Sequence, residues 1–527
     1  MKLLFKWKYF PQALLVLLTA SVYSFSASFP LLEGWDDHAY VSCNTERLHP
    51  SLDNMIYWLG HPCEGCYLPL TMYSYMLDYA VCGLNSVGYH IQSIFWHTMA
   101  VLAVFNIMKW FGINLWLAFA LSLIFSIHPQ RVESVVWISE RKDVMCAAFY
   151  FWSFYYYISG DRQRFPLIPL ILFILAMLSK SMAISLPLVF IVCEYAAENK
   201  FNPKAWTRKL WPFFLVAAVF LPVTIMSQDI NREGISLSRQ AYVLVHNVAW
   251  YVRTAFVSGW PSPIYPRVTL SSSEIFTTVS CYIVLIAAAM YFFLINKMYF
   301  RDGVIPLFCC FLASLAPVAG FFPLGAIDYA DRYSYIPSAF LWTMVGGLII
   351  NTFRKISSTE RKQRSIINLK LMTYGGILYI MVFAFMNVVY SDIWRDYCSV
   401  LTAACVHEPP SYIALGALGD VELSRGNYGE AIKISERIIS RQKGLETEKG
   451  YAKIILKAKY TMAYALYKNG DKQQALKIFE EIKPYLNENS FGALEGYVAM
   501  VKMMVDSCNS IGDSERAEKL KKEIICR

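Results

Sequence analysis

Charge is the property that this sequence has least of. Only 17% of its 527 residues are Asp, Glu, Lys or Arg, whereas 56% are hydrophobic, and a soluble globular protein has about 25% charged residues. The mean hydropathy is +0.38. This composition excludes an ordinary cytosolic enzyme, and 34 Phe, 35 Tyr and 14 Trp exclude a disordered chain. We therefore expect an all-α, polytopic membrane protein with a water-soluble part attached.

The sequence also lacks the cysteine patterns typical of zinc and haem sites. No second C-x-x-C accompanies Cys63 and Cys66, and no His follows Cys66 as haem attachment requires. A zinc site that uses His49 and His61 is the less favoured interpretation. A disulfide between Cys63 and Cys66 in an oxidising compartment, or two free thiols, is preferred, and the sequence does not decide between these two.

The charges are concentrated at the C-terminal end of the chain. From Asp392 onward there are 20 of the 48 basic and 19 of the 39 acidic residues, and the remainder crowd into short breaks between apolar runs. This distribution predicts a membrane domain over residues 1–390 and a soluble domain over residues 391–527. The basic excess reflects membrane topology rather than nucleic-acid binding.

Eleven apolar runs are expected to be membrane spans. They cover residues 13–29, 89–108, 115–127, 144–158, 166–178, 183–195, 210–226, 276–295, 304–322, 336–350 and 371–389. The segment 242–256 contains His246, Asn247 and Arg253 and is interpreted as interfacial or re-entrant, although a span there stays open.

An N-terminus on the inner side gives a consistent topology. Inner loops then hold 18 of the 28 basic residues of the membrane part, as the positive-inside rule expects. These residues are Lys2, Lys6, Lys8, Lys109, Arg162, Arg164, Lys200, Lys204, Arg208, Lys209, Lys297, Arg301, Arg354, Lys355, Arg361, Lys362, Arg364 and Lys370. An odd number of spans places the C-terminal domain outside.

The C-terminal domain is predicted to consist of helical hairpins. Gly426, Gly470 and Gly512 each separate two apolar-periodic segments and are 44 and 42 residues apart. The pattern resembles tetratricopeptide repeats with lengthened helices, since the usual period is about 34 residues. A stack of such hairpins makes a concave surface suited to an extended peptide. The alternative is a helical cap that only solubilises the outer face.

The candidate chemistry begins just after the first apolar run, at Trp35-Asp36-Asp37-His38. Two adjacent carboxylates at the boundary of water and membrane are costly to keep near lipid without a role. Their repulsion raises the pKa of one carboxyl and leaves the other as a base. The alternative is a solvated loop or a helix N-cap.

Further ionisable residues fall in the same set of predicted outer loops. Together with the Asp pair, the topology gathers His128, Arg141, Lys142, Lys180 and Arg332 on one face. Carboxylates beside cations at a bilayer surface suit an acidic lipid-linked donor, because a cation stabilises a departing phosphate. Each cation taken alone can equally snorkel to headgroups or pair with a neighbouring carboxylate.

An ordered set of motifs resembles the transmembrane-and-tetratricopeptide-repeat O-mannosyltransferases, in the C superfamily of glycosyltransferases, and in particular bacterial relatives of them. The motifs are Trp35-Asp36-Asp37, Tyr67-Leu68-Pro69-Leu70-Thr71, Leu77-Asp78-Tyr79, Gly83-Leu84-Asn85, Gly88-Tyr89-His90, His128-Pro129, Glu133 to Asp143, Ser179-Lys180-Ser181-Met182 and Asp331 to Pro337. The resemblance covers residues from about 30 to 350 and, more loosely, the C-terminal domain.

The resemblance implies a fold and an activity. Members of the superfamily take a sugar from a polyprenyl-phosphate carrier on the lumenal or periplasmic side of the membrane. Their first outer loop, here about residues 30–88, supplies the catalytic carboxylate, which maps onto Asp36 or Asp37. The eukaryotic branch transfers mannose to Ser or Thr of folded β-rich domains. The C-terminal domain of this chain is short, so the choice of acceptor does not carry over.

We therefore expect an inverting glycosyltransferase that transfers a sugar from a polyprenyl-phosphate donor to a protein Ser or Thr hydroxyl. Asp36 or Asp37 is the expected base, and Arg332, with Lys180 or with Arg141 and Lys142, holds the leaving phosphate. The residues expected to support the site are His38, His128, Glu140, Asp143, Asp331 and Tyr333.

Neither a cofactor nor a metal is expected, because Arg and Lys neutralise a lipid monophosphate. The expected partners are the lipid-linked donor, membrane lipids and a protein acceptor held by the C-terminal domain, and no nucleic acid. A bacterial inner membrane with a periplasmic site is favoured because no retention signal ends the chain, and the endoplasmic reticulum stays open.

Three alternatives remain. In the first, the protein is a glycosyltransferase whose acceptor is a lipid or surface glycan. In the second, it is a transporter of lipid-linked sugars. In the third, it is a non-catalytic membrane anchor for a repeat scaffold. Transporters have their polar binding residues near the middle of the membrane. Here the polar residues lie at the ends of spans on one face, which argues against transport. A non-catalytic anchor leaves the Asp pair and the outer cations unexplained.

Overall fold

The computed structural model describes most of the chain, which is helical. The described residues are 9–161, 164–198, 200–227, 237–268, 272–296, 303–320, 327–357, 362–406, 410–440, 449–485 and 494–525. The chain divides into two compact units. The larger comprises Met1–Pro263 and Arg267–Tyr397, and the smaller comprises Ile264–Pro266 and Cys398–Arg527. The domain boundary expected at 390–391 lies in the last turn of α17 (Lys362–Ile393).

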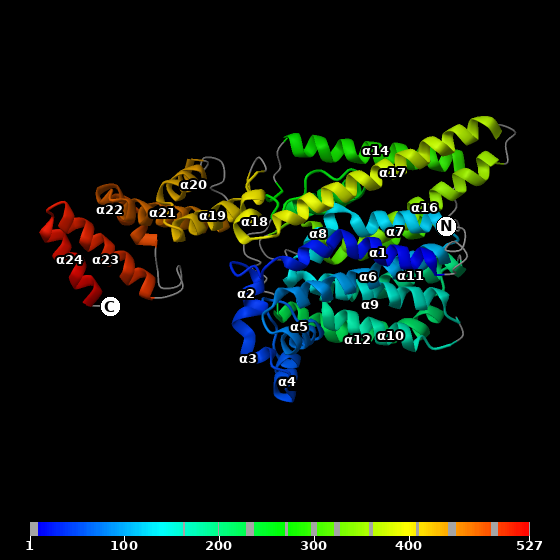
Figure 1. Ribbon diagram of the computed structural model, residues 1–527, viewed down its shortest axis with the longest axis horizontal. Coiled ribbons are helices and arrows are strands. Elements are labelled where there is room, and N and C mark those ends of the chain that lie inside the picture. The colour runs from blue at the N-terminus through cyan, green and yellow to red at the C-terminus, as the bar shows by residue number, and fades with distance from the viewer. Residues whose placement is uncertain are drawn as a thin grey trace. The chain divides into compact units, whose positions relative to one another are not determined.

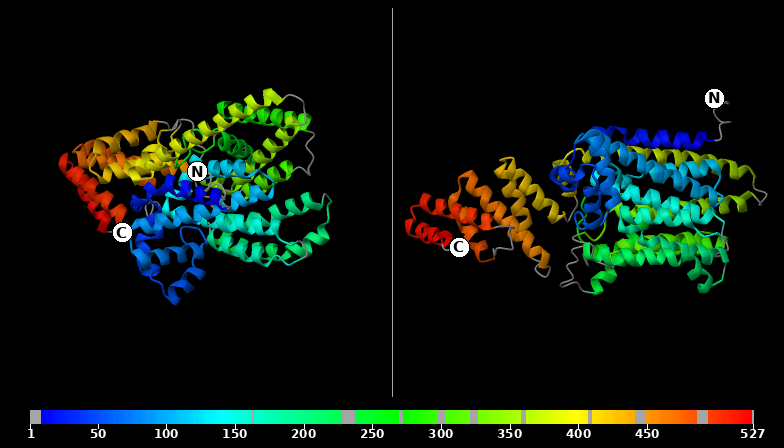
Figure 2. Two further views of the ribbon diagram at one scale, coloured as in Figure 1. Left: turned by 45° about the vertical axis from the view of Figure 1, so that its right-hand side comes forward. Right: turned by 90° about the horizontal axis from the view of Figure 1, so that it is seen from below.

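The larger unit is a bundle of long helices that run back and forth (Figures 1 and 2). Each expected apolar run largely coincides with a helix, although residues 321–322 lie outside the described part. Besides α17, these helices are α1 (Phe10–Tyr23), α6 (Ser86–Trp110), α7 (Leu115–Ile127), α9 (Arg141–Ser159), α10 (Leu167–Ser179), α11 (Leu186–Glu198), α12 (Pro203–Ser227), α14 (Ser272–Asn296), α15 (Val304–Leu315) and α16 (Tyr335–Ser357).

The protein is a multi-pass integral membrane protein. Among the described residues, six helical segments are long and apolar enough to cross a membrane, and a seventh results when the bent pair Leu115–Ile127 and Pro129–Val136 counts as one span. The number eleven stays a prediction, because α10 and α15 have only 13 and 12 residues and α9 begins with three charged side chains. A straight span needs about 20 residues.

Side-chain caps and a proline set where the chain reverses near the candidate site. The Asn85 side chain accepts a hydrogen bond from the Val87 amide at the start of α6, and Asn114 does the same for Leu117 at the start of α7. Such caps satisfy amides that have no intrahelical partner. After α7, Pro129 begins a bent segment that contains η4 (Pro129–Arg131), α8 (Val132–Val136) and η5 (Ile138–Glu140).

The predicted first outer loop is a compact helical insertion at one end of the bundle. It contains α2 (Asp36–Tyr40), α3 (Thr45–Leu48), α4 (Leu52–Gly60) and α5 (Pro69–Cys82), and it lies at the end opposite the start of α1 (Figure 1). Tyr40, Trp58, Met72 and Tyr75 form its apolar core. Such a core holds the Asp pair on a rigid support.

Cys63 and Cys66 are paired through their backbones in this insertion. Each residue donates its amide to the carbonyl of the other at 2.9 Å, and Glu64 and Gly65 between them have φ values of 46° and 68°. This is the geometry of a tight hairpin turn, which favours glycine at positive φ. Both thiols are free in this structure.

The basic residues predicted to be inside lie at the other end of the bundle where the structure describes them. Lys109 is in the last turn of α6, and Lys204, Arg208 and Lys209 lie in the first turns of α12. Lys2, Lys6, Lys8, Arg162, Lys297, Arg301 and Arg361 lie outside the described residues.

The segment predicted to be interfacial is part of a 20-residue helix, α13 (Leu237–Phe256). The Asn247 amide donates to the carbonyls of Ala319 and Asp328, and the Tyr251 hydroxyl donates to the carbonyl of Ala330. α13 therefore fixes the backbone that leads into α16.

The smaller unit contains α19 (Tyr412–Ser424), α20 (Tyr428–Ser440), α21 (Lys449–Asn469), α22 (Lys472–Ile482), α23 (Leu494–Ser510) and α24 (Ser514–Ile525). Gly426, Gly470 and Gly512 have φ between 80° and 96° and stand between the helices of the three successive pairs. Phe479, Met500 and Leu520 belong to an apolar core that the last two pairs share. The hairpins predicted from the glycines are present, and their assignment as tetratricopeptide repeats stays a prediction.

Candidate active site

Asp37 is a buried carboxylate that accepts hydrogen bonds from Leu32 and Ser139. Its side-chain oxygens accept hydrogen bonds from the Leu32 amide at 2.9 Å, from the Ser139 amide at 2.9 Å and from the Ser139 hydroxyl. Burial raises the pKa of Asp37 to about 6, although the Ser139 and Leu32 hydrogen bonds oppose the shift. Asp37 therefore ties the first insertion to the loop after α8.

Asp36 occupies a different environment although it is the next residue. Its side chain is half-buried, and within the described part of the chain no hydrogen-bond or ion-pair partner is found for it. Burial raises the pKa of Asp36, and the cations of Lys142 and Arg332 only partly offset that shift. A half-exposed carboxylate without a fixed partner is free to accept a proton from a bound molecule.

Glu140 is the centre of the charged cluster beside Asp36. One of its oxygens lies 3.0 Å from Lys142 Nζ and 3.6 Å from Arg332 Nε, and the other lies 3.3 Å from Lys180 Nζ. Burial disfavours the charge of Glu140, but the three cations outweigh burial and hold its pKa well below the usual range. The carboxylate is therefore ionised and joins three separate elements.

Two further carboxylates complete the cluster. Lys180 also pairs with Asp143, and Arg332 pairs through its guanidinium with Glu133, which also accepts the Arg332 amide at 3.0 Å. Lys180 and Arg332 are thus each paired with two buried carboxylates, as buried charges require. Burial raises the pKa of Glu133 and of Asp143 to about 7. Asp36 adds a fourth negative group at the edge.

The three cations differ in how accessible they are. The side chains of Lys180 and Arg332 are 14% and 12% exposed, whereas Lys142 is 5% exposed. Arg332 also lies over the ring of Tyr333, with 5.1 Å from Cζ to the ring centroid. Lys180 and Arg332 are therefore the more accessible cations of the cluster.

Arg141 faces away from this cluster. Its guanidinium is fully buried and pairs with Asp78 at 2.5 Å, and it donates to the Ser74 hydroxyl at 3.1 Å and to the Tyr89 carbonyl at 2.8 Å. These contacts join α9 to α5 and α6. The structure separates Arg141 from Lys142 because consecutive helical residues point about 100° apart.

Three other predicted residues make their described hydrogen bonds and ring contacts outside the cluster. His38 is exposed and contacts Glu33 at 3.2 Å. His128 Nδ1 accepts from the Gln130 amide, and its ring packs against Phe383. Asp331 accepts from the Gln130 side chain at 3.0 Å.

Sequence reasoning missed several residues that build the site. Glu133 and Ser139 stood inside a recognised motif but carried no assigned role. The ring centroid of Trp137 lies 5.1 Å from that of Trp35 and 5.3 Å from that of Trp394. Trp394 follows the last predicted span and belongs to no motif that the sequence analysis recognised. Among the described residues, no group of three or more His, Cys, Asp or Glu is arranged to hold a metal ion.

Comparisons with known proteins find a distant likeness to protein O-mannosyl-transferases. No family model matches the chain. It is 24% identical over 225 residues to human protein O-mannosyl-transferase TMTC4, and 30% identical over 90 residues to a protein O-mannosyl-transferase of Caenorhabditis elegans. These segments are 38% and 16% of this chain. They cover only 28% and 12% of the two relatives.

Among solved structures, ArnT from Cupriavidus metallidurans bound to undecaprenyl phosphate aligns with a TM-score of 0.37 at 13% identity. The alignment covers 90% of this chain and 81% of that chain. A TM-score this low does not establish a shared fold.

The different surroundings of the two aspartates predict different effects on stability. Asp37→Ala leaves two amides and a hydroxyl without their acceptor, so we expect a loss of about 2–3 kcal/mol in the free energy of unfolding. Asp36→Ala removes no described hydrogen bond, and we expect a change within about 0.5 kcal/mol. Denaturant unfolding of the purified protein, followed by tryptophan fluorescence, measures both. Equal losses in the two variants would contradict this assignment.

Proposed function

We propose that this protein is a membrane glycosyltransferase that moves a sugar from a polyprenyl-phosphate donor to a protein hydroxyl. The observation that carries the proposal is the position of Asp36, a half-buried carboxylate without a fixed partner among the described residues. It lies on the same short helix as Tyr40, whose ring centroid is 4.8 Å from Lys142 Nζ, and the charges of Lys142 and Arg332 act on it. The likeness to protein O-mannosyl-transferases supports the reaction class and the protein acceptor.

Asp36 is the proposed general base, and Asp37 is a positioning residue. The oxygens of Asp37 already accept three hydrogen bonds and the residue is buried, so an incoming hydroxyl reaches Asp36 more readily than it reaches Asp37. Asp36 has no such bonds among the described residues. A raised pKa also brings a carboxylate closer to the strength that a general base needs near neutral pH.

The proposed reaction is a single displacement at the anomeric carbon. The acceptor hydroxyl gives its proton to Asp36 while its oxygen forms the new bond to the anomeric carbon. The bond from that carbon to the phosphate oxygen breaks, and the polyprenyl phosphate leaves with the bonding electrons. Attack from the face opposite the leaving group inverts the anomeric configuration.

Arg332 and Lys180 are the proposed phosphate ligands, with Lys142 behind them. Negative charge grows on the phosphate as it leaves, and a preorganised cation stabilises that charge more than it stabilises the ground state. The two side chains are the more exposed cations of the cluster. Arg141 is proposed to be a structural residue, since Asp78, Ser74 and Tyr89 already bind its guanidinium.

The site is proposed to face the outer, periplasmic side of a bacterial inner membrane. Eleven spans with an inner N-terminus give this orientation, and the described basic residues Lys109, Lys204, Arg208 and Lys209 lie at the end of the bundle opposite α2–α5. The pairs α19–α20, α21–α22 and α23–α24 are proposed to be tetratricopeptide-like and to bind the acceptor protein.

Deleting the gene tests the acceptor class. We expect periplasmic and secreted proteins of the deletion strain to lack a hexose-sized mass on Ser or Thr peptides that the parent strain carries. Mass spectrometry of both strains measures this difference. If the proteins are unchanged and a lipid or surface glycan loses a sugar instead, the acceptor in the proposal is replaced by that glycan.

Replacing the proposed base predicts a loss of transfer without a loss of folding. Asp36→Asn should lower kcat by a factor on the order of 10² to 10⁴, measured with purified protein and a polyprenyl-phosphate sugar. In the wild type, kcat/KM should fall as the pH drops through the raised pKa of Asp36, because the protonated carboxyl accepts no proton. His38→Asn, which changes an exposed side chain on the same short helix, is the matched control. Full activity of Asp36→Asn would remove Asp36 from the mechanism.

Replacing Arg332, a proposed phosphate ligand, should lower the transferase activity by more than the loss of its ion pair with Glu133 explains. Arg332→Gln should lower kcat by a factor on the order of 10² to 10³. The same change leaves Glu133 buried without its partner, which destabilises the fold. The double variant Arg332→Gln with Glu133→Gln removes that unpaired charge, so stability should recover while activity stays low. Recovery of activity in the double variant would assign Arg332 a structural role only.

A further inference from the structure

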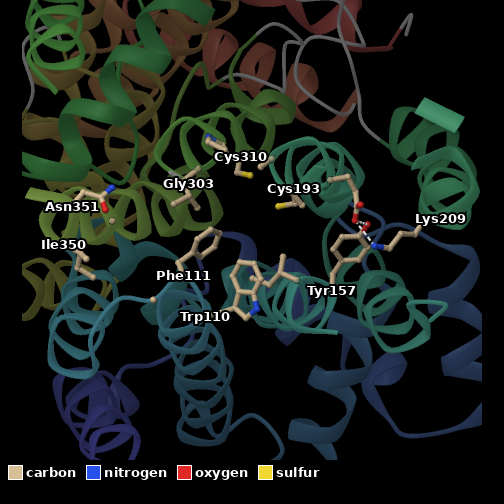
Figure 3. A pocket seen from close by; sticks show the side chains of 17 residues that line it. Trp110, Phe111, Tyr157, Cys193, Lys209, Gly303, Cys310, Ile350 and Asn351 are labelled. Atoms are coloured by element: carbon tan, nitrogen blue, oxygen red, sulfur yellow. Dashed lines mark hydrogen bonds and ion pairs between the residues drawn. The ribbon is translucent and has the colours of Figure 1, made fainter. Parts of the chain in front are cut away.

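A separate cavity of about 520 Å³ is shown in Figure 3. Its lining includes Trp110 at the end of α6 and Tyr157 near the end of α9, so it lies at the opposite end of the bundle from Asp36. α9 begins at Arg141 beside the site and ends at Ser159 beside the cavity. Its 19 residues span roughly 28 Å at 1.5 Å per residue, which is close to the thickness of a bilayer core. The cavity and the candidate active site therefore lie at opposite ends of the bundle, separated by about the thickness of a bilayer core.

The polar part of the cavity wall is an ion pair between Lys209 and Glu194. Lys209 Nζ lies 2.7 Å from Glu194 Oε1, and the Tyr157 hydroxyl donates to the same oxygen at 2.6 Å. The ammonium also lies 4.5 Å from the centre of the Tyr157 ring. Glu194 is 6% exposed and Lys209 is 19% exposed. The cavity thus presents one cation and one anion side by side.

The remainder of the wall is largely apolar and includes glycines. Trp110, Phe111 and Ile350 line it, and Asn351 adds an amide at its edge (Figure 3). Gly347 of α16 also lines the cavity, and a Cβ added there would meet no atom within 4 Å. The space is therefore available to a ligand rather than filled by packing.

Exposed tryptophans mark the depth of this end of the bundle in the membrane. Trp110, at the end of α6, is 45% exposed, and Trp116, in the first turn of α7, is 44% exposed. Trp211, two residues after Lys209 on α12, is 54% exposed. Tryptophan concentrates at the level of lipid headgroups. The cavity therefore lies where headgroups are the most abundant ligands.

We propose that this cavity binds a single phospholipid whose headgroup carries a phosphate and a primary ammonium group. The phosphate takes Lys209, the ammonium takes Glu194, and the glycerol and the first acyl carbons contact Trp110 and Phe111. A lipid with only a negative headgroup brings an uncompensated charge next to Glu194. A quaternary ammonium headgroup has no N–H to donate to that carboxylate. This site stands independently of the proposed sugar transfer.

Lipid titration of the purified full-length protein in detergent tests the proposal. Phosphatidylethanolamine, phosphatidylglycerol and phosphatidylcholine with the same acyl chains are added separately, and bound lipid is counted by native mass spectrometry. We expect one phosphatidylethanolamine bound at least about tenfold more tightly than the other two. Gly347→Phe, which fills the cavity, and Lys209→Gln should each weaken this binding about tenfold or more. Gly375→Phe, on an exposed part of α17 where a Cβ also meets nothing within 4 Å, should not change it.

Several results would overturn the proposal. Equal binding of the three lipids means that only the bilayer-facing surface is occupied, and tighter phosphatidylglycerol binding means that the ion pair does not select the headgroup. Unchanged binding by Gly347→Phe places the lipid elsewhere. If Lys209→Gln unfolds, Gly347→Phe decides alone, because that variant leaves the pair of Lys209 and Glu194 intact.

Discussion

The architecture of the candidate site depends on one buried carboxylate, that of Glu140. It binds Lys142 from the start of α9, Lys180 from the turn after α10 and Arg332 from the turn before α16. Each of these ions is too costly to bury alone, so each needs the others to be in place. Glu133 and Asp143 add a second carboxylate partner to Arg332 and to Lys180. The same pairing that closes the bundle at this end therefore keeps cations ready beside Asp36.

The two adjacent aspartates of α2 have different surroundings: Asp37 is held by hydrogen bonds, and Asp36 is partly exposed. Asp37 uses its oxygens to hold Leu32 and Ser139, which fixes α2 against the loop after α8. Asp36 is left half-buried at the edge of the cluster. In the proposed mechanism, a base held rigidly by its neighbour loses little entropy when an acceptor arrives, and preorganisation of this kind is a large part of catalysis by positioning. The apolar core around Tyr40 and Tyr75 supports this arrangement.

The two ends of the bundle differ, with a charged cluster at one end and a largely apolar cavity at the other. α9 has Lys142 in its first turn and α16 follows Arg332 at the end of the bundle beside Asp36, and both helices line the cavity at the other end. Charged groups are tolerated at both ends because each is paired, as Arg332 is with Glu133 and Lys209 is with Glu194. Between the ends the helices satisfy their own backbone hydrogen bonds, which is the condition for crossing a bilayer.

Sequence by itself determined the helical class, the reversal points and the face on which the motifs gather. Backbone groups in lipid must be satisfied within a helix, so long apolar runs leave few alternatives, and the glycines before α20, α22 and α24 end their helices through positive φ. Only the tertiary structure decided which charges meet. Arg141 and Lys142 are neighbours in the chain, yet one binds Asp78 and the other binds Glu140, because a helix turns consecutive side chains in different directions. Pairings such as that of Glu133 with Arg332 join residues far apart in sequence, and no local pattern encodes them.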